Sequence, residues 1–166
     1  MRNEARALPG TAVALALKDR SSLRGVLVTG APGSGKTRLA LELIEGCRWG
    51  RSRLISDDVV TAWAEDGRIV ADAPERLCGL VELRGTGLAR IEPSGPTPLF
   101  AVIALEDRGR LPPERRVHPL GPDGPALPLF AWQGRAAGLL TFLRSVASGH
   151  SATAGHDAVS PGTGTP

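Results

Sequence analysis

Short apolar runs separated by turns are the main pattern in the first part of the chain, and they predict strands. Residues 11–17, 25–30, 52–57, 79–85 and 98–107 each fit one strand, and the last run is the most hydrophobic. The run at 25–30 is apolar without interruption, which predicts burial on both faces. Residues 59–74 hold two apolar runs around Asp66-Gly67, a dipeptide typical of a hairpin turn.

Two segments instead have the apolar spacing of helices, residues 36–47 and 132–148. The first is rich in leucine and closes on Gly46, a common helix terminator. Residues 108–129 between the strands and the second helix contain too many prolines and glycines for a long helix. Residues 151–166 are small and polar, so we expect a disordered C-terminal tail after a single domain at 1–150.

Strands followed by helices predict an α/β fold, with a mixed β-sheet and helices packed on it. A chain of 166 residues that is 42% hydrophobic can bury a real core. The net charge of +3 includes no basic run long enough for a nucleic-acid arm. Without a signal peptide or a membrane-spanning run, we expect a cytoplasmic protein with no nucleic-acid or membrane partner. Cys47 and Cys78 lack metal-binding spacing and are expected to be reduced thiols.

The segment GAPGSGKT has the pattern of a phosphate-binding loop, between an apolar strand and a helix as that motif requires. Its glycines allow successive backbone N–H groups to point at phosphate oxygens, and the following helix adds the positive end of its dipole. The candidate nucleotide-binding residues are therefore Gly30, Ala31, Pro32, Gly33, Ser34, Gly35, Lys36 and Thr37.

Lys36 is one of only two lysines in a chain that otherwise uses arginine as its cation. A lysine ammonium can reach the β- and γ-phosphates in a tight loop, whereas the larger planar guanidinium of arginine cannot replace it there. The hydroxyl of Thr37 is then expected to bind Mg²⁺. These residue types predict a nucleotide with β- and γ-phosphates as the ligand and Mg²⁺ as its metal.

An acidic pair, Asp57 and Asp58, follows the apolar run at 52–57. A carboxylate at the carboxyl end of a buried strand lies beside the phosphates, where it can hold Mg²⁺ or take a proton from an attacking hydroxyl. Adjacent residues on a strand point to opposite faces, so only one of the two can aim at the γ-phosphate. The alternative is a pair that caps the next turn.

The segment GLVELRGTGL alternates charged and apolar residues, which places Glu82 and Arg84 on one side of a strand before the glycines at 85 and 87. A carboxylate and a guanidinium on one face suit a second Mg²⁺ contact and a clamp for transition-state charge. From the residues alone, an edge strand with an ordinary Glu–Arg pair fits equally well.

Other polar and aromatic residues have simpler interpretations. Glu106 or Asp107 could serve as a second acid near the nucleotide, but a solvated strand end fits their polar surroundings better. His118 lies among prolines and is expected at the surface. The aromatic residues Trp63, Phe130 and Trp132 are expected to pack in the core or at its edge.

The motifs GAPGSGKT, RLISDDVV and GLVELRGTGL, in this order, resemble the catalytic domain of HPr kinase/phosphorylase over roughly residues 11–98. The third motif is the specific one, because many families share the phosphate loop. The resemblance implies an HPr kinase/PEP carboxykinase-like fold in a short form that consists of the C-terminal catalytic domain only. It also implies ATP- and Mg²⁺-dependent phosphorylation of a serine on the phosphocarrier protein HPr, phosphorolysis of the product, and a homo-oligomer, in this family a hexamer.

Carried over by motif, the resemblance gives each candidate a role. Lys36 binds phosphate, Thr37 and Glu82 hold Mg²⁺, and Asp58 is the general base, with Asp57 beside it. Arg84 belongs with Gly85 to the loop that serves both directions of the reaction.

The chain also departs from the family pattern. The family has a histidine near residues 9–11, where this chain has Pro-Gly-Thr, and Thr86 replaces a usual leucine in the third motif. Two alternatives therefore stay open. One is a small-metabolite kinase, although the prolines after Arg108 argue against an arginine-rich lid helix. The other is a nucleotide-sensing module that has lost phosphotransfer.

Overall fold

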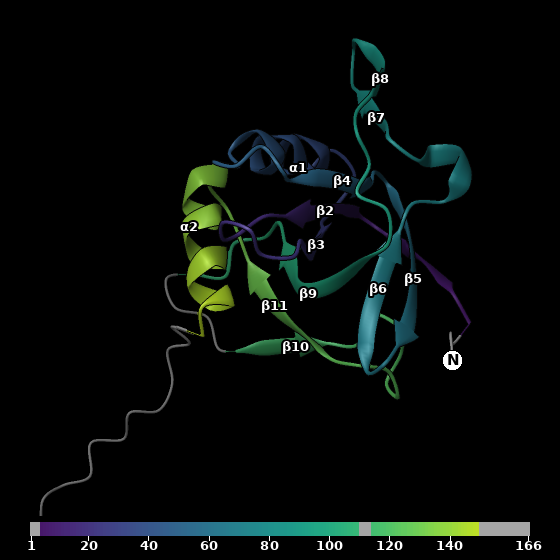
Figure 1. Ribbon diagram of the computed structural model, residues 1–166, viewed down its shortest axis with the longest axis vertical. Coiled ribbons are helices and arrows are strands. Elements are labelled where there is room, and N and C mark those ends of the chain that lie inside the picture. The colour runs from purple at the N-terminus through teal and green to yellow at the C-terminus, as the bar shows by residue number, and fades with distance from the viewer. Residues whose placement is uncertain (1–3, 110–113, 150–166) are drawn as a thin grey trace, which may run out of the picture.

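The computed structural model describes residues 4–109 and 114–149, which form a mixed β-sheet with two α-helices (Figure 1). The predicted α/β fold is thereby confirmed. The expected tail at 151–166 lies outside the described residues. Among the described residues, neither helix is long and apolar enough to cross a membrane.

Seven strands form the main path of the sheet, and two more branch from its centre. In spatial order, the path runs β1 (Arg6–Pro9), β5 (Val59–Glu65), β6 (Arg68–Asp72), β9 (Thr97–Ala104), β3 (Arg24–Thr29), β2 (Thr11–Leu15) and β4 (Arg53–Ser56). The branch consists of β11 (Leu127–Ala131), which pairs with β9, and β10 (Arg115–Val117), which pairs with β11.

The direction of the central strands decides where their ends meet. Strand β3 is parallel to β9, and β9 is parallel to β11. Strand β2 is antiparallel to both β3 and β4, so β4 runs in the same direction as β3. The carboxyl ends of β3, β4, β9 and β11 therefore lie at one edge of the sheet, together with the amino end of β2.

The two helices, α1 (Lys36–Glu45) and α2 (Ala136–Ala147), pack against one another and cover one face of the central strands (Figure 1). Their apolar faces bury Leu39 and Leu43 of α1 and Leu139 and Leu143 of α2 against the odd-numbered side chains of β2. Gly46 follows the last turn of α1, at a point where α1 approaches α2 closely. A side chain would not fit there, because a Cβ would lie 2.7 Å from a methyl carbon of Leu140. Both predicted helices are confirmed, although α1 ends at Glu45 and α2 begins at Ala136, four residues later than predicted.

The opposite face of the central strands is covered by the curled end of the same sheet. The β5–β6 hairpin packs its apolar side against the even-numbered residues of β2, which are the small Ala12 and Ala14. Its turn is the predicted Asp66-Gly67, with φ values of 49° and 73°. These two positive φ values match the hairpin turn that an Asp-Gly sequence favours. Strands β2 and β3 are thus buried on both faces, as the sequence predicts for β3.

A second hairpin, β7 (Leu80–Leu83) and β8 (Gly87–Arg90), pairs only with itself and projects from the body (Figure 1). A short 3₁₀-helix, η1 (Glu75–Leu77), precedes it. Val81 anchors the base of this hairpin in the core below the helices, with 1% of its surface exposed. Towards the tip, Leu88 is 73% exposed. The sequence predicts β7 but not β8, which follows the glycines at 85 and 87.

Candidate active site

The phosphate-loop sequence joins β3 to α1, and the acidic pair joins β4 to β5. Because β3 and β4 flank β2 and run in the same direction, these two connections emerge at the same edge of the sheet. Such an edge of a mostly parallel sheet is the usual place for ligands in α/β proteins. The topology alone therefore brings together residues that lie some 20 positions apart, as Thr37 and Asp57 do.

The glycine loop curls as its sequence predicts. Gly33 and Gly35 have φ values of 77° and 97°, which side-chain-bearing residues rarely adopt. Gly30 is needed for a different reason, since a Cβ there would lie 2.6 Å from the Ser34 hydroxyl. Lys36 Nζ donates hydrogen bonds to the carbonyl oxygens of Gly30 and Ala31, at 3.1 and 3.2 Å. The lysine is folded back over its own loop.

Asp57 is the carboxylate that faces the loop. It is 8% exposed, and the Thr37 hydroxyl donates to its Oδ1 at 2.8 Å. The Thr11 hydroxyl donates to the same oxygen at 2.9 Å, and the backbone N–H of Glu82 donates to Oδ2 at 3.4 Å. Donors from β2, α1 and β7 thus fix one carboxylate from three sides.

Asp58 is placed differently. Its side chain is exposed and makes no hydrogen bond or ion pair with the part of the chain that the structure describes. Its backbone has a φ of 69°, and its carbonyl accepts a hydrogen bond from Gly10 N–H at 3.1 Å. The prediction that adjacent aspartates diverge is confirmed, and the one that contacts the loop is Asp57.

The β7–β8 hairpin brings the third motif to the loop. Arg84 Nη1 lies 3.5 Å from the point where a Cβ on Gly33 would be, so its guanidinium sits over the glycine loop. The side chain of Glu82 is exposed, while its backbone N–H reaches Asp57. Strand β7 therefore passes beside the acidic pair and ends above the phosphate loop.

The oxygen donors at this corner suit Mg²⁺. Thr37 Oγ1 and the Asp57 carboxylate are within 2.8 Å of each other, and both are hard oxygen ligands. The described residues contain no group of three or more His, Cys, Asp and Glu side chains placed to hold a metal. Mg²⁺ in nucleotide sites typically takes one or two carboxylates and completes its shell with water and phosphate. The residues present fit that pattern and do not form an all-protein cage.

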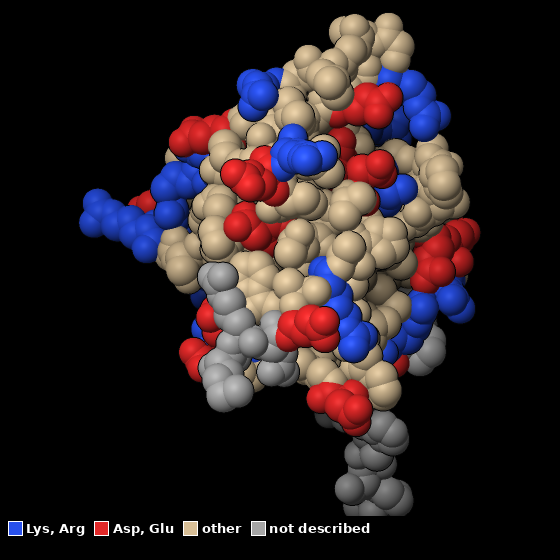
Figure 2. All heavy atoms as spheres, turned by 90° about the vertical axis from the view of Figure 1, so that its right-hand side faces the viewer, with Lys and Arg blue, Asp and Glu red and all other residues tan. Residues whose placement is uncertain are grey.

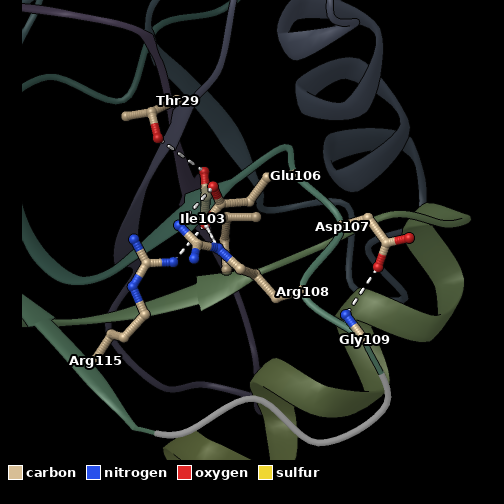
Figure 3. A network of polar contacts seen from close by, with 7 residues as sticks. All are labelled: Thr29, Ile103, Glu106, Asp107, Arg108, Gly109 and Arg115. Carbon is tan, nitrogen blue, oxygen red and sulfur yellow. Dashed lines mark hydrogen bonds and ion pairs between the residues drawn. The ribbon is translucent and has the colours of Figure 1, made fainter.

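Glu106, considered as a second acid, is already engaged at the end of β9. Its carboxylate pairs with Arg115 and with Arg108, whose Nε lies 3.1 Å away (Figure 3). Hydrogen bonds from Arg115 and Arg108 lower the pKa of Glu106 below its ordinary value. Asp107 accepts a hydrogen bond from Gly109 N–H at 2.9 Å and turns the chain. This network stabilises the end of β9. It agrees with the prediction that Glu106 and Asp107 lie at a solvated strand end and do not serve as a second acid near the nucleotide.

The remaining candidates take structural places as well. His118 is exposed, with Nδ1 2.9 Å from the Gly124 carbonyl oxygen. Trp63 is 6% exposed, and Phe130 makes an edge-to-face contact with Phe142 at 4.8 Å between ring centroids. The predictions of a surface histidine and packed aromatic residues are confirmed. On the face shown in Figure 2, acidic and basic side chains are interspersed and form no continuous patch of one sign.

Sequence reasoning overlooked one residue of this corner, Thr11. A polar residue at the start of an otherwise apolar buried strand is the signal that could have identified it, since a buried hydroxyl needs a partner.

The fold and the loop define the class: an α/β protein in which a phosphate-loop sequence leaves a central strand and a carboxylate from a neighbouring strand end meets the threonine of the loop. Residues 22–94, which include all three motifs, match the family described as HPr Serine kinase C-terminal domain. Over this part of its length, the chain is therefore similar to HPr serine kinase C-terminal domains.

Curated relatives show the same similarity. The HPr kinase/phosphorylase of Bacillus subtilis is 39% identical over 89 residues, which are 53% of this chain and 27% of the relative. That of a Geobacillus strain is 42% identical over 86 residues, 51% of this chain and 26% of the relative. The chain thus matches only about a quarter of the length of these proteins.

The fold agreement extends further along the chain. The solved Hpr(Ser) kinase/phosphatase of Coxiella burnetii superposes with a TM-score of 0.66 at 20% identity, covering 87% of this chain and 95% of that chain. This confirms the HPr kinase-like fold.

Proposed function

We propose that this protein is a cytoplasmic, ATP- and Mg²⁺-dependent kinase that phosphorylates a serine of HPr or of an HPr-like phosphocarrier protein. The observation that carries the proposal is the contact between Thr37 of the phosphate loop and Asp57 of the acidic pair. It joins a phosphate-binding element to an acid from another strand, as phosphoryl transfer requires. The similarity to this family suggests the acceptor, because the similar proteins are named HPr kinase/phosphorylases. We extend the proposal to a homo-oligomeric assembly, on the resemblance to the family alone.

The nucleotide half of the site consists of the loop and the start of α1. Backbone N–H groups of the loop and of the first turn of α1 would face the phosphates, since α1 begins at Lys36 with no side chain capping its free N–H groups. Pro32 has no N–H to offer, and the N–H of Ser34 already bonds the Ala31 carbonyl at 3.0 Å. Lys36 exchanges its two carbonyl contacts for the β- and γ-phosphate oxygens. This exchange is inexpensive because the ammonium trades neutral acceptors for charged ones.

Thr37 and Asp57, with Glu82 nearby, are the residues that would hold Mg²⁺. When bound, the metal neutralises charge on the phosphates during transfer. Thr37 can offer an oxygen lone pair to it because its proton is already donated to Asp57. Asp57 thus serves the site in two ways, as a negative charge and as the acceptor that orients the threonine.

Asp58 is the proposed general base. Its exposed carboxylate, next to the buried Asp57, is free to approach a serine on the surface of another protein. As the serine oxygen forms its bond to the γ-phosphorus, its proton passes to Asp58, and the bond from phosphorus to the ADP oxygen breaks. Arg84 lies over the loop and stabilises charge on the transferring group. In phosphorolysis, an oxygen of inorganic phosphate forms a bond to the phosphoserine phosphorus while the bond from phosphorus to the serine oxygen breaks. The serine oxygen takes a proton from Asp58, and pyrophosphate is the other product.

Two observations favour a second candidate, a nucleotide-sensing module without transfer. No imidazole stands at residues 9–11, and Asp58 contacts neither Lys36 nor Thr37. If the site cannot bring a base to the acceptor, it still retains the features for nucleotide binding.

The deciding experiment incubates the purified chain with γ-labelled ATP, Mg²⁺ and purified HPr, and follows label on HPr. Wild-type HPr and a variant with its acceptor serine changed to alanine form the matched pair. Label on wild-type HPr but not on the alanine variant supports the proposal. Label on a small molecule instead supports a metabolite kinase, and tight nucleotide binding with no transfer supports the sensing module.

A further inference from the structure

We propose that Thr11 is a positioning residue of the site: its buried hydroxyl holds Asp57 in the orientation that lets Thr37 bind the metal. This inference rests on the proposed Mg²⁺ site and adds a residue from β2 that none of the three sequence motifs contains. Thr11 touches neither nucleotide nor metal in this proposal, and it acts only through Asp57.

The first argument concerns the hydrogen bonds that the Asp57 carboxylate accepts. Thr11 is fully buried, and its hydroxyl donates to Asp57 Oδ1 at 2.9 Å. Thr37 donates to the same oxygen at 2.8 Å, while, among the described residues, Oδ2 receives only the longer contact from Glu82 N–H. Thr11 and Thr37 lie on different elements, so the shared oxygen links the sheet to the loop. Without Thr11, the aspartate would keep Thr37 and the long contact from Glu82 N–H, and it could rotate so that Thr37 loses a fixed acceptor for its proton.

The second argument is that the backbone around Thr11 is fixed in place. Thr11 is opposite Val28 in the β2–β3 ladder, two positions before Gly30. The preceding Gly10 has a φ of 141°, and a Cβ there would lie 2.7 Å from the Val28 carbonyl oxygen. Gly10 N–H also bonds the carbonyl of Asp58. The β1–β2 junction is therefore clamped between the strand that feeds the loop and the bend that carries the acidic pair.

These contacts predict a specific defect when the Thr11 hydroxyl is removed. Some residues hydrogen-bond a metal ligand without touching the metal. Substituting such a residue typically lowers metal affinity by about 10- to 100-fold. Binding of nucleotide without metal depends on Lys36 and the loop N–H groups, which Thr11 does not contact. A buried hydrogen bond with a purely structural role would instead lower stability and leave the effect of Mg²⁺ unchanged.

The test compares Thr11→Val, which keeps the side-chain shape, with Thr11→Ser, which keeps the hydroxyl. Thr97→Val is the matched control, because Thr97 is also buried (4% exposed) but bonds Ser94 and Gly95. Affinity for ATP is measured by calorimetry with Mg²⁺ and with EDTA. We expect Thr11→Val to lose about 10- to 100-fold of the Mg²⁺-dependent gain in affinity and none of the affinity in EDTA. Thr11→Ser and Thr97→Val should keep the wild-type ratio.

The outcomes separate this inference from the proposed function. A wild-type chain whose affinity gains nothing from Mg²⁺ overturns the proposed metal site, and this inference with it. A wild-type gain that persists in Thr11→Val overturns the inference alone, as does an equal loss with Mg²⁺ and with EDTA. If Thr11→Val shows no cooperative melting transition, Thr11→Ala removes the same hydroxyl without branching and is judged by the same two affinities.

Discussion

The phosphate loop and the β7–β8 hairpin carry the two halves of the proposed site, and they are built differently. The loop is continuous with β3, a central strand that is buried on both faces, and the Thr37 hydroxyl donates a hydrogen bond to a buried carboxylate. The hairpin pairs only with itself, and its tip is exposed. A two-stranded hairpin has little stability of its own. The nucleotide half is thus part of the core, whereas the half that would meet the acceptor protein depends on the anchor at its base.

This contrast suggests a division of labour. Groups on the sheet can be positioned rigidly for a small ligand, and groups on a projecting hairpin can adjust to the surface of a protein. It follows that changes in the two regions should affect different measurements. Changes at the loop should remove nucleotide binding, and changes at the hairpin or at Asp58 should remove transfer while binding survives.

The largest effect is expected from Asp58→Asn. Loss of a general base should lower the rate of transfer to HPr by about 10²- to 10⁴-fold. Asparagine tolerates the positive φ of 69° at this position, so the fold should not change. The initial rate of label transfer measures this loss. The affinity for ATP is measured as well, and it should stay near the wild-type value. Asp66→Asn is the control, another aspartate with positive φ but in the distant β5–β6 turn. Transfer at the wild-type rate would assign the base to another residue.

Arg84→Ala should follow, with a loss of about 100-fold in the transfer rate. The guanidinium lies over Gly33, where it can stabilise charge that develops during transfer. Arg84→Lys should recover only part of the rate, because an ammonium lacks the planar fork. The exposed Arg90→Ala on the other strand of the hairpin is the matched control. If Arg84→Ala weakens ATP binding as much as transfer, the hairpin belongs to the nucleotide half, and the contrast drawn above is wrong.

Lys36→Ala should reduce affinity for ATP by about 100-fold or more, since two charge-assisted hydrogen bonds of roughly 1.5–3 kcal/mol each are lost. Thermal unfolding should be nearly unchanged, because Lys36 Nζ bonds only two loop carbonyls in the described structure. Calorimetry of ATP binding checks the first expectation, and a melting curve checks the second. Lys18→Ala, which changes the other lysine of the chain, should have no effect on either. Undiminished ATP affinity in Lys36→Ala would end the case for a phosphate-binding loop.

The smallest effect compares two apolar residues of the projecting hairpin. Val81→Ala should destabilise the protein by about 2 kcal/mol, since Val81 is 1% exposed and its methyl groups fill the core below the helices. Leu88→Ser should change the free energy of unfolding by less than about 0.5 kcal/mol, because Leu88 is 73% exposed. Urea unfolding measures both. Equal losses would mean that the tip of the hairpin is covered in solution.

Much of the molecule could be predicted from local sequence. The glycine loop, the two helices and the Asp66-Gly67 turn follow from local preferences. Glycine adopts positive φ at little cost, and the apolar spacing of a helix is set by residues a few positions apart. Strands β1, β8, β10 and β11 were not predicted, and they have weak patterns of their own. Each is a short strand whose residues extend only because a neighbouring strand offers hydrogen bonds.

For the site, the sequence by itself determined the chemical groups: an ammonium behind a glycine loop, a threonine, an acidic pair, and a Glu–Arg motif. Only the tertiary structure decided which aspartate faces the loop, that Arg84 lies over Gly33, and that Thr11 joins the site. The physical reason is that these contacts depend on strand order and direction. Strand β2 lies between β3 and β4 and runs against both, and this pairing of segments distant in sequence places its first residue beside the ends of its neighbours.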